Sequence, residues 1–417
     1  MAPQASVAAL ADDAAERFVR YAGVDTQSDD DSTTYPSTAK QLDLLRMLAD
    51  ELRELGLEDV ELDEHGYVFA TVPATVEHDV PVIGFLAHVD TSPDVSGENV
   101  QPQRIRYEGG PIVLPADASQ VIRPEDSPEL EPHVGHELIT TDGMTLLGAD
   151  DKAGVAEIMA AVAYLVAHPE APHGKLRIAF NPDEEVGRGT EYFELERFGA
   201  VAAYTLDGQT AGELQSETFS GASVRMTVRG RSIHPGLAKD AMVNAIKLAS
   251  QILERLPKDA LSPETTEGRE GYVHPTDIRG DSGVVELRFI VRDFENDELD
   301  ANVELLRGLA AEVAARDERA SIEVESFIQY RNMRDTLQKH PEIVEHLDEA
   351  VRRVGLEPRR TAIRGGTDGS ALTEMGLPTP NIFTGGHDAH SEREWICVED
   401  MGLAAATVIS LAQIWAE

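Results

Sequence analysis

Three short runs of mostly apolar residues constrain the fold of this chain more than any other feature. The runs 82–87, 176–180 and 202–206 have the length of strands and lack a regular alternation of polar and apolar residues. Stretches with helical apolar spacing, such as 9–21 and 151–167, lie before and between them. Strands that are covered on both faces by helices are typical of parallel or mixed sheets. We therefore predict an α/β fold in which helices flank a mixed sheet.

The pattern changes after residue 218. Strand-like and helix-like segments then follow one another in the order β-α-β-β-α-β, over 222–228, 242–256, 271–276, 284–292, 295–315 and 321–329. This order is typical of a small antiparallel sheet with helices on one face. Since the α/β pattern resumes near residue 342, we predict an inserted α+β domain over 219–330. The first domain would then consist of 1–218 and 331–417.

Charge and cysteine content narrow the possible partners and the compartment. Lys and Arg number 36 against 76 Asp and Glu, which gives a net charge of −40. Such a chain is repelled by nucleic acid and by anionic membranes, so we expect neither as a partner.

Cys397 is the only cysteine, so an intrachain disulfide is excluded. No run reaches the ~18 apolar residues of a membrane helix, and residues 1–4 lack a signal-peptide pattern, so we expect a cytoplasmic protein.

Histidine and acidic residues follow the apolar runs and precede the helix at 151–167. They are His88 and Asp90, Asp150 and Asp151, Glu184 and Glu185, Asp207, and the downstream pair His387 and His390. Ligands gather at the carboxyl ends of strands in open α/β sheets. Imidazole nitrogens and carboxylate oxygens are the donors that a pair of divalent cations requires. Together these residues predict a two-metal hydrolase site.

Taken singly, most of these residues have a simpler explanation. Asp150 precedes a helix and is a suitable N-cap, and Asp207 precedes Gly208 as a turn residue would. His88 taken alone is better explained as a core histidine. Glu184 and Glu185 are more specific, because neighbours on an extended segment point in opposite directions. One of them can bind a metal while the other acts as a general base.

Six sequence motifs together resemble one known family. They are AHVDT at 87–91, ITTDG at 139–143, LGADDKAG at 147–154, PDEEVG at 182–187, IRGGTDG at 363–369 and NIFTGG at 381–386. Over essentially its full length the chain resembles the peptidase T family, the tripeptide aminopeptidases of the dinuclear zinc exopeptidase and deacylase superfamily. The resemblance implies a zinc-exopeptidase-like catalytic domain that carries the inserted domain as a lid.

The resemblance also implies a role for each site residue. Two zinc ions per subunit would be held by His88 and Asp207, by Glu185 and His390, and by Asp150 as a bridge between the ions. Glu184 would be the general base and Asp90 a supporting aspartate. The family's Thr-Gly-Gly-x-x-x-His ending selects His390 over His387, which spacing alone leaves undecided. The family also has a cis peptide at the position of Asp150–Asp151. Mn²⁺ and Co²⁺ are possible substitutes for zinc with these ligands.

Three further residues are candidates in the same reaction. In the family the lid histidine, here His234, is implied to stabilise the oxyanion, in some relatives from the partner subunit. Arg292 and Arg364 could bind a substrate carboxylate through paired N–H donors, although structural arginines remain an alternative. The expected partners are short peptides, above all tripeptides, and a second copy of the chain, since open sheet edges suit a homodimer. The alternatives are an N-acyl amino-acid deacylase or desuccinylase and a non-catalytic metal-binding protein.

Overall fold

A mixed eight-stranded sheet forms the centre of the first of two units in the computed structural model, which describes residues 6–417. Residues 1–5, on which the expectation about a signal peptide rests, lie outside this description. The first unit comprises residues up to Ser216, Asp335–Thr361 and Thr367–Glu417, and the second comprises Glu217–Arg334 and Ala362–Gly366. The short segment belongs to the second unit because Phe219 N–H donates to the Ile363 carbonyl at 3.0 Å.

The strands of the large sheet come from both halves of the chain. Their order across the sheet is β1 (Glu58–Leu62), β2 (Val68–Val72), β8 (Leu176–Asn181), β3 (Ile83–His88), β9 (Ala202–Gly208), β16 (Asn381–Phe383), β10 (Glu213–Thr218) and β15 (Arg359–Ile363). The central strands β8, β3, β9 and β16 pair in parallel, whereas the pairs β1–β2, β2–β8 and β10–β16 are antiparallel. The mixed α/β fold is therefore confirmed.

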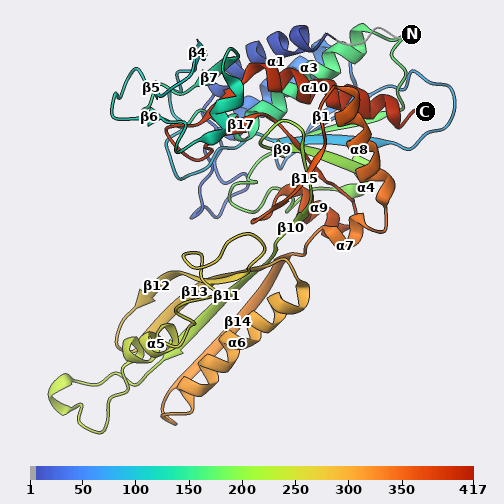
Figure 1. Cartoon of the computed structure of the whole chain (residues 1–417). Helices are drawn as coiled ribbons and strands as arrows, with labels where there is room; N and C mark the ends of the chain where they lie inside the picture. The colour runs from blue at the N-terminus through green and yellow to red at the C-terminus, as the bar shows by residue number, and fades with distance from the viewer. Residues whose placement is uncertain (1–5) are drawn as a thin grey trace. The chain divides into compact units, whose positions relative to one another are not determined.

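The helices of the first unit pack against this sheet and one another. They are α1 (Val7–Ala22), α2 (Gln41–Glu54), α3 (Ala149–Ala167), α4 (Leu195–Phe198), α7 (Arg334–Leu337, at the unit boundary), α8 (Pro341–Arg353), α9 (Asp368–Met375) and α10 (Val398–Ile414). Helices α1, α3 and α10 pack together, and α3 lies on β3 and β9 (Figure 1). Gly402 permits the close approach of α10 to α1, because a Cβ there would lie 2.5 Å from the Val7 carbonyl oxygen. Among residues 6–417 no helix combines the length and the apolar character needed to cross a membrane.

A second, smaller sheet of the first unit has no counterpart in the sequence-based expectations. It consists of β17 (Gly386–His387), β18 (Trp395–Cys397), β7 (Glu137–Thr140) and β4 (Gln103–Arg106), with the hairpin β5 (Ile112–Val113) and β6 (Val121–Ile122) nearby in the chain. Its strands are only two to four residues long. Such strands are too short to show a period of two, so their pairing depends on contacts between distant segments.

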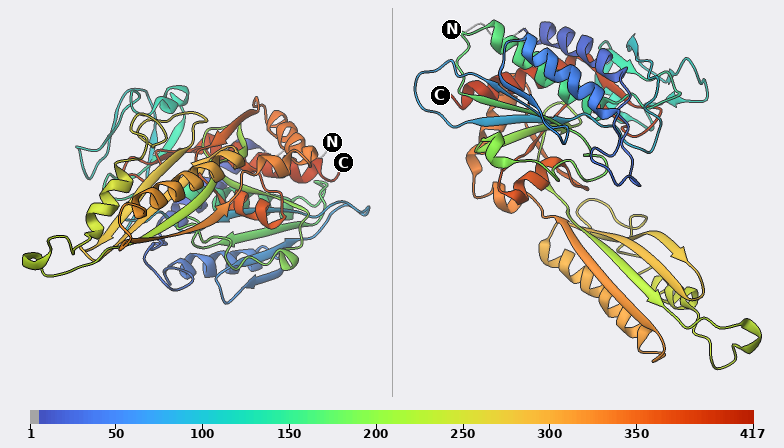
Figure 2. Two further views of the ribbon diagram at one scale, coloured as in Figure 1. Left: turned by 90° about the horizontal axis from the view of Figure 1, so that it is seen from below. Right: turned by 180° about the vertical axis from the view of Figure 1, so that it is seen from behind.

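The second unit is a four-stranded antiparallel sheet with two helices. Along the chain its main elements are β11 (Ser220–Arg229), η2 (Pro235–Leu237), α5 (Ala245–Leu253), β12 (Tyr272–Gly280), β13 (Val284–Asp293), α6 (Asn296–Ala314) and β14 (Ser321–Tyr330). Across the sheet the strands lie in the order β12-β13-β11-β14. Alternate residues of β11 and β13 pack on α5 and α6 to form this unit's core, and α6 runs along the strands (Figure 2).

Candidate metal centre

The sheet register of the first unit brings the acidic and histidine residues to one edge. His88 is the last residue of β3 and pairs with Asn181, the last residue of β8. Glu184 and Glu185 follow β8 directly, and Asp207 lies near the end of β9. These strands are parallel, so their carboxyl ends meet at the same edge, where ligands bind in open α/β sheets.

Asp150 occupies the middle of this group. Its Oδ1 lies 3.1 Å from His88 Nε2, and its Oδ2 lies 3.3 Å from His390 Nε2. His390 Nε2 also lies 2.9 Å from Glu185 Oε2. Asp150 and the following residue lack helical dihedral angles although they fall within α3, and their peptide bond is cis. The two oxygens of a single carboxylate thus face two different histidines.

Glu184 and Asp207 also lie near the His88 ring. His88 Nε2 lies 3.9 Å from Glu184 Oε2 and 4.0 Å from Asp207 Oδ1. Asp150 and Asp207 also line a cavity of about 40 Å³. Donor atoms of His88, Asp150 and Glu185 lie within 4.8 Å of one another, as do those of His88, Asp151 and Asp207. Asp150 contacts both His88 and His390.

Asp90 lies behind the cluster and is fully buried. Its carboxylate accepts the backbone N–H of Glu184 at 3.0 Å and that of Glu185 at 3.1 Å. His88 Nδ1 lies 3.3 Å from Asp90 Oδ1 and 3.1 Å from the Asp90 carbonyl oxygen. Both of these neighbours are acceptors, so Nδ1 carries the proton when the ring is neutral. The lone pair of Nε2 is then directed toward Asp150, as in metal sites where a carboxylate orients a histidine ligand.

The turn that carries the two glutamates is fixed by the N-terminal part of the chain. Asp183 has a φ of 63°, in the left-handed region that non-glycine residues rarely adopt. Its carboxylate accepts hydrogen bonds from the Ser37 backbone N–H at 2.6 Å and from Gln41 Nε2 at 2.7 Å. These contacts hold Asp183 in a strained conformation, as is common where side chains must be placed accurately.

The electrostatics of the cluster fit a requirement for cations. Burial, together with the neighbouring Asp150, raises the pKa of Glu185 to about 7 and that of Asp207 above its usual range. Burial and nearby acids also raise the pKa of Glu184. Glu185 Oε1 is buried without a hydrogen-bond partner. Two divalent cations would offset this clustered negative charge, and the imidazole and carboxylate donors are types that both zinc and manganese accept.

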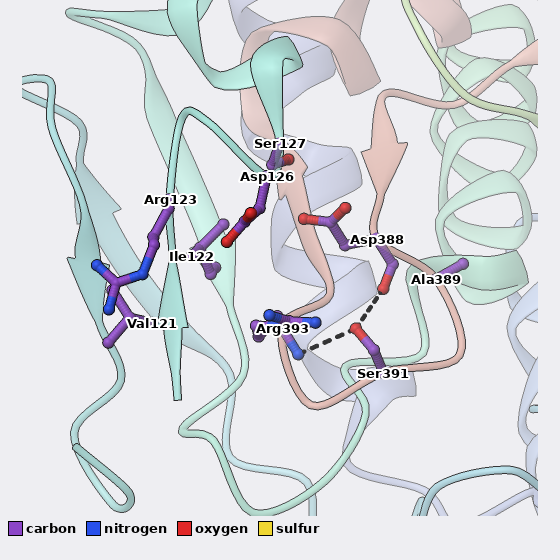
Figure 3. A pocket seen from close by; sticks show the side chains of 9 residues that line it. All are labelled: Val121, Ile122, Arg123, Asp126, Ser127, Asp388, Ala389, Ser391 and Arg393. Atoms are coloured by element: carbon purple, nitrogen blue, oxygen red, sulfur yellow. Dashed lines mark hydrogen bonds between the residues drawn. The ribbon is translucent and has the colours of Figure 1, made fainter. Parts of the chain in front are cut away.

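His390 lies on the loop between β17 and β18 and has a φ of 59°. Hydrogen bonds to Asp150 and Glu185 raise the pKa of its imidazole to about 11. The loop is held by Ser391, whose hydroxyl donates to the Asp388 carbonyl at 2.7 Å and accepts the Arg393 backbone N–H at 3.1 Å (Figure 3). These residues line a pocket of about 230 Å³ beside His390. His387 lines the smaller cavity instead, and its Nε2 has no hydrogen-bond partner.

Comparison with known proteins identifies the family. A model of peptidase family M20/M25/M40 matches residues 128–414. A peptidase T of Exiguobacterium sp. is 50% identical over 403 residues, which cover 96% of this chain and 98% of that protein. The chain belongs to the M20 peptidases.

Two solved structures share the fold of this M20 peptidase. The aminopeptidase PepT from Bacillus cereus has a TM-score of 0.76 at 23% identity, over 98% of this chain and 99% of that one. A dinuclear metal binding peptidase of the M20 family from Bacillus subtilis has a TM-score of 0.66 at 16% identity, over 98% and 99% of the two chains. The M20 family is metal-dependent, in agreement with the donor set at the sheet edge.

Two buried acids of the M20 site were not singled out by sequence reasoning. Glu394 accepts backbone N–H groups from Leu147, Gly148 and Asp150 at 2.7, 2.7 and 3.0 Å and thereby fixes the segment that carries Asp150. Asp368 accepts a hydrogen bond from Asn181 Nδ2 at 2.5 Å. Asp368 lies in the IRGGTDG motif, and this motif could have identified it from the sequence as a candidate site residue. Glu394 lies in a polar stretch that is indistinguishable from a surface loop.

The metal-free protein should lose stability as the pH rises from about 4.5 to about 7. Burial raises the pKa of Glu394 from its ordinary 4.5 to about 7 and that of Asp368 to about 6. The folded chain therefore binds more protons than the unfolded chain in this interval, so the free energy of unfolding falls with rising pH. Glu394 alone contributes a loss of about 3 kcal/mol at most. Urea unfolding of chelator-treated protein at several pH values measures the trend.

The variant Glu394→Gln provides the control for this pH dependence. Its amide does not titrate, so the decline should be shallower than in the wild-type chain. A metal-free wild-type protein that becomes more stable between these pH values would contradict the assignment of raised pKa values to the site.

The remaining three candidates lie in the second unit. His234 is exposed at the start of η2, where its Nδ1 accepts the Gly236 N–H at 3.1 Å. Arg292 donates to the Val291 carbonyl at 3.0 Å and lies over the Tyr330 ring. Arg364 donates to two carbonyl oxygens, at 2.7 and 3.0 Å, in the loop that precedes β12, and it lies over the Phe219 ring. These contacts all lie within the second unit.

Proposed function

We propose that this M20 peptidase is a zinc-dependent aminopeptidase that removes the N-terminal residue from tripeptides. The position of Asp150 carries the proposal, because its two carboxylate oxygens face His88 and His390 separately. A carboxylate in this position is suited to bridge two cations ~3.5–4 Å apart. One cation would be held by His88 and Asp207, the other by Glu185 and His390.

Glu184 is the proposed general base. Its carboxylate lies next to the donors around His88 without a hydrogen bond to that ring, and its backbone is fixed by Asp90. When bound, the two cations would supply a Lewis acid for the peptide carbonyl and would lower the pKa of the attacking water. Glu184 would accept the proton of that water and later deliver it to the leaving amine.

The second unit is proposed to act as a lid and as a dimerisation surface. His234 would stabilise the oxyanion, in its own subunit or in its partner's, and Arg292 and Arg364 would bind the carboxylate of the substrate. Strands β12 and β14 are the edges of the second sheet, and each pairs with one neighbour only within the described residues. Such edges can pair with a second copy of the chain to form a homodimer. The buried, free Cys397 supports a cytoplasmic setting.

Substrate preference gives the direct test of this function. We expect zinc-dependent release of the N-terminal residue from an unblocked tripeptide, and little or no hydrolysis of its N-acetylated form or of the matching dipeptide. The measurement is the rate of amino-acid release with zinc and with chelator, for all three substrates at one concentration. The 50% identity to a peptidase T supports this expectation.

The other outcomes separate the alternatives. Release of acetate from the acetylated peptide would move the chain to the deacylases, which would use the same metals with a different substrate pocket. A protein that binds two metals but hydrolyses neither the tripeptide, nor its N-acetylated form, nor the dipeptide would favour a non-catalytic metal-binding function.

A further inference from the structure

A second group of metal-binding side chains lies outside the proposed dinuclear site. His133 ends the short helix η1 (Pro128–His133), His136 precedes β7, and Cys397 ends β18. One donor atom from each of these residues lies within 4.8 Å of those of the other two. They come from segments about 260 residues apart in the chain, and sequence spacing therefore gives no indication of the group.

The distances within this group are close to those around a tetrahedral cation. The two Nδ1 atoms of His133 and His136 lie 3.2 Å apart, and Cys397 Sγ lies 3.8 Å from His136 Nδ1. Bond lengths of ~2.0–2.1 Å to nitrogen and ~2.3 Å to sulfur place tetrahedral ligand atoms roughly 3.3–3.7 Å apart. The Glu399 carboxylate lies 3.6 Å from Sγ and also accepts the Glu137 backbone N–H.

The surroundings of His133 match those of a metal ligand. His133 Nε2, the nitrogen that faces away from the group, lies 3.6 Å from Asp400 Oδ2, which has no hydrogen-bond partner. Metal-binding histidines commonly direct their second ring nitrogen at a carboxylate. Burial lowers the pKa of His133, which keeps the imidazole neutral and able to bind.

Cys397 is also placed to act as a thiolate. It is the N-cap residue of α10 and lies at the N-terminus of that helix, although its side chain accepts no capping hydrogen bond. A helix N-terminus favours a negative charge. Burial nevertheless raises the pKa of the free thiol, so the thiolate forms only when a cation replaces the proton. The proton passes to solvent as the metal–sulfur bond forms.

We propose that His133, His136 and Cys397 form a third, structural metal site for a thiophilic divalent cation such as Zn²⁺. Glu399 or a water molecule completes the coordination. The site links the η1 segment and β7 to the start of α10. The competing explanation of the geometry is a hydrogen bond between the two imidazoles, with no metal. In that case Cys397 is a packed core thiol and the protein binds no third cation.

Cobalt substitution tests this proposal directly, because Cys397 is the only cysteine in the chain. Any thiolate-to-Co²⁺ charge-transfer band in the near ultraviolet must arise from this residue. We expect the metal-depleted protein to bind three equivalents of Co²⁺ and to show the band. The variants Cys397→Ser and His136→Ala should each bind two equivalents, lack the band and keep their peptidase activity. The exposed-histidine control His340→Ala should bind three and keep the band.

Two results would overturn the third site. The first is a wild-type protein without the band in the presence of excess Co²⁺. The second is a band that persists in His136→Ala. The variant Asp150→Asn separates this proposal from the dinuclear one, since it should lose the metals of the peptidase site and retain the band. A protein that shows the band but hydrolyses no peptide would keep the third site and refute the proposed activity.

Discussion

The substitution Glu184→Gln should lower kcat for tripeptide hydrolysis by about 10²–10⁴-fold while the protein still binds the metals of the peptidase site. Glutamine has the shape of glutamate but cannot accept the proton of the attacking water. Glu184 also makes no hydrogen bond to His88, from which it lies 3.9 Å away, so its replacement leaves the closer donors in place. Steady-state kinetics together with metal analysis of the purified variant measure both parts of the prediction.

A surface glutamate serves as the matched control. Glu194 is exposed, and Glu194→Gln makes the same chemical change away from the cluster. It should leave kcat within a factor of two or so of wild type, since most surface substitutions have small effects. A Glu184→Gln enzyme with near-wild-type kcat would show that another group is the base. A variant that has lost its metals would instead make Glu184 a ligand.

The substitution Asp150→Asn should impair both cation sites at once. Asp150 contacts His88 through one oxygen and His390 through the other. Replacing one oxygen by an amide nitrogen removes the charge and one of the two donors. We expect metal content to fall below one equivalent at the peptidase site and kcat/KM to fall by at least about 10³-fold, which corresponds to several kcal/mol of lost transition-state stabilisation.

The comparison for this variant is Asp79→Asn at an exposed position, which should retain both metals and full activity. Far-ultraviolet circular dichroism distinguishes loss of metal from loss of fold. If Asp150→Asn loses only one metal, Asp150 is a ligand of a single ion and not a bridge. Full retention of both metals and of activity would remove Asp150 from the site.

Local sequence predicted the long elements and the acids that follow them. The mostly apolar character of β3 and β9 reflects burial on both faces of the central sheet, which any α/β sheet with flanking helices imposes. His88 and Asp207 could be located because each comes directly at the end of such a strand. Glu394 could not, because its three backbone donors belong to the segment 147–150, about 245 residues earlier in the chain.

Arg364, in the short segment Ala362–Gly366 of the second unit, also has contacts that local sequence could not predict. Arg364 lies within the IRGGTDG motif at 363–369 and is a candidate for binding a substrate carboxylate. In the structure its guanidinium donates to the carbonyl oxygens of Gly268 and Glu270 in the second unit, which its sequence position did not predict. A motif identifies which residues a family retains, but the hydrogen-bond partners of a long side chain depend on which distant loop packs against it.

By itself the sequence determined the α/β class and the residue types available for a two-metal site. Apolar periodicity and the ends of strands are local properties, so a window of roughly ten to twenty consecutive residues is sufficient to recognise them. The tertiary structure alone decided that Asp150 faces two histidines and that Asp90 supports both glutamates. It also decided that His133, His136 and Cys397 meet. Each of these contacts joins segments far apart in the chain, and such contacts form only when the sheet, its helices and their loops pack together.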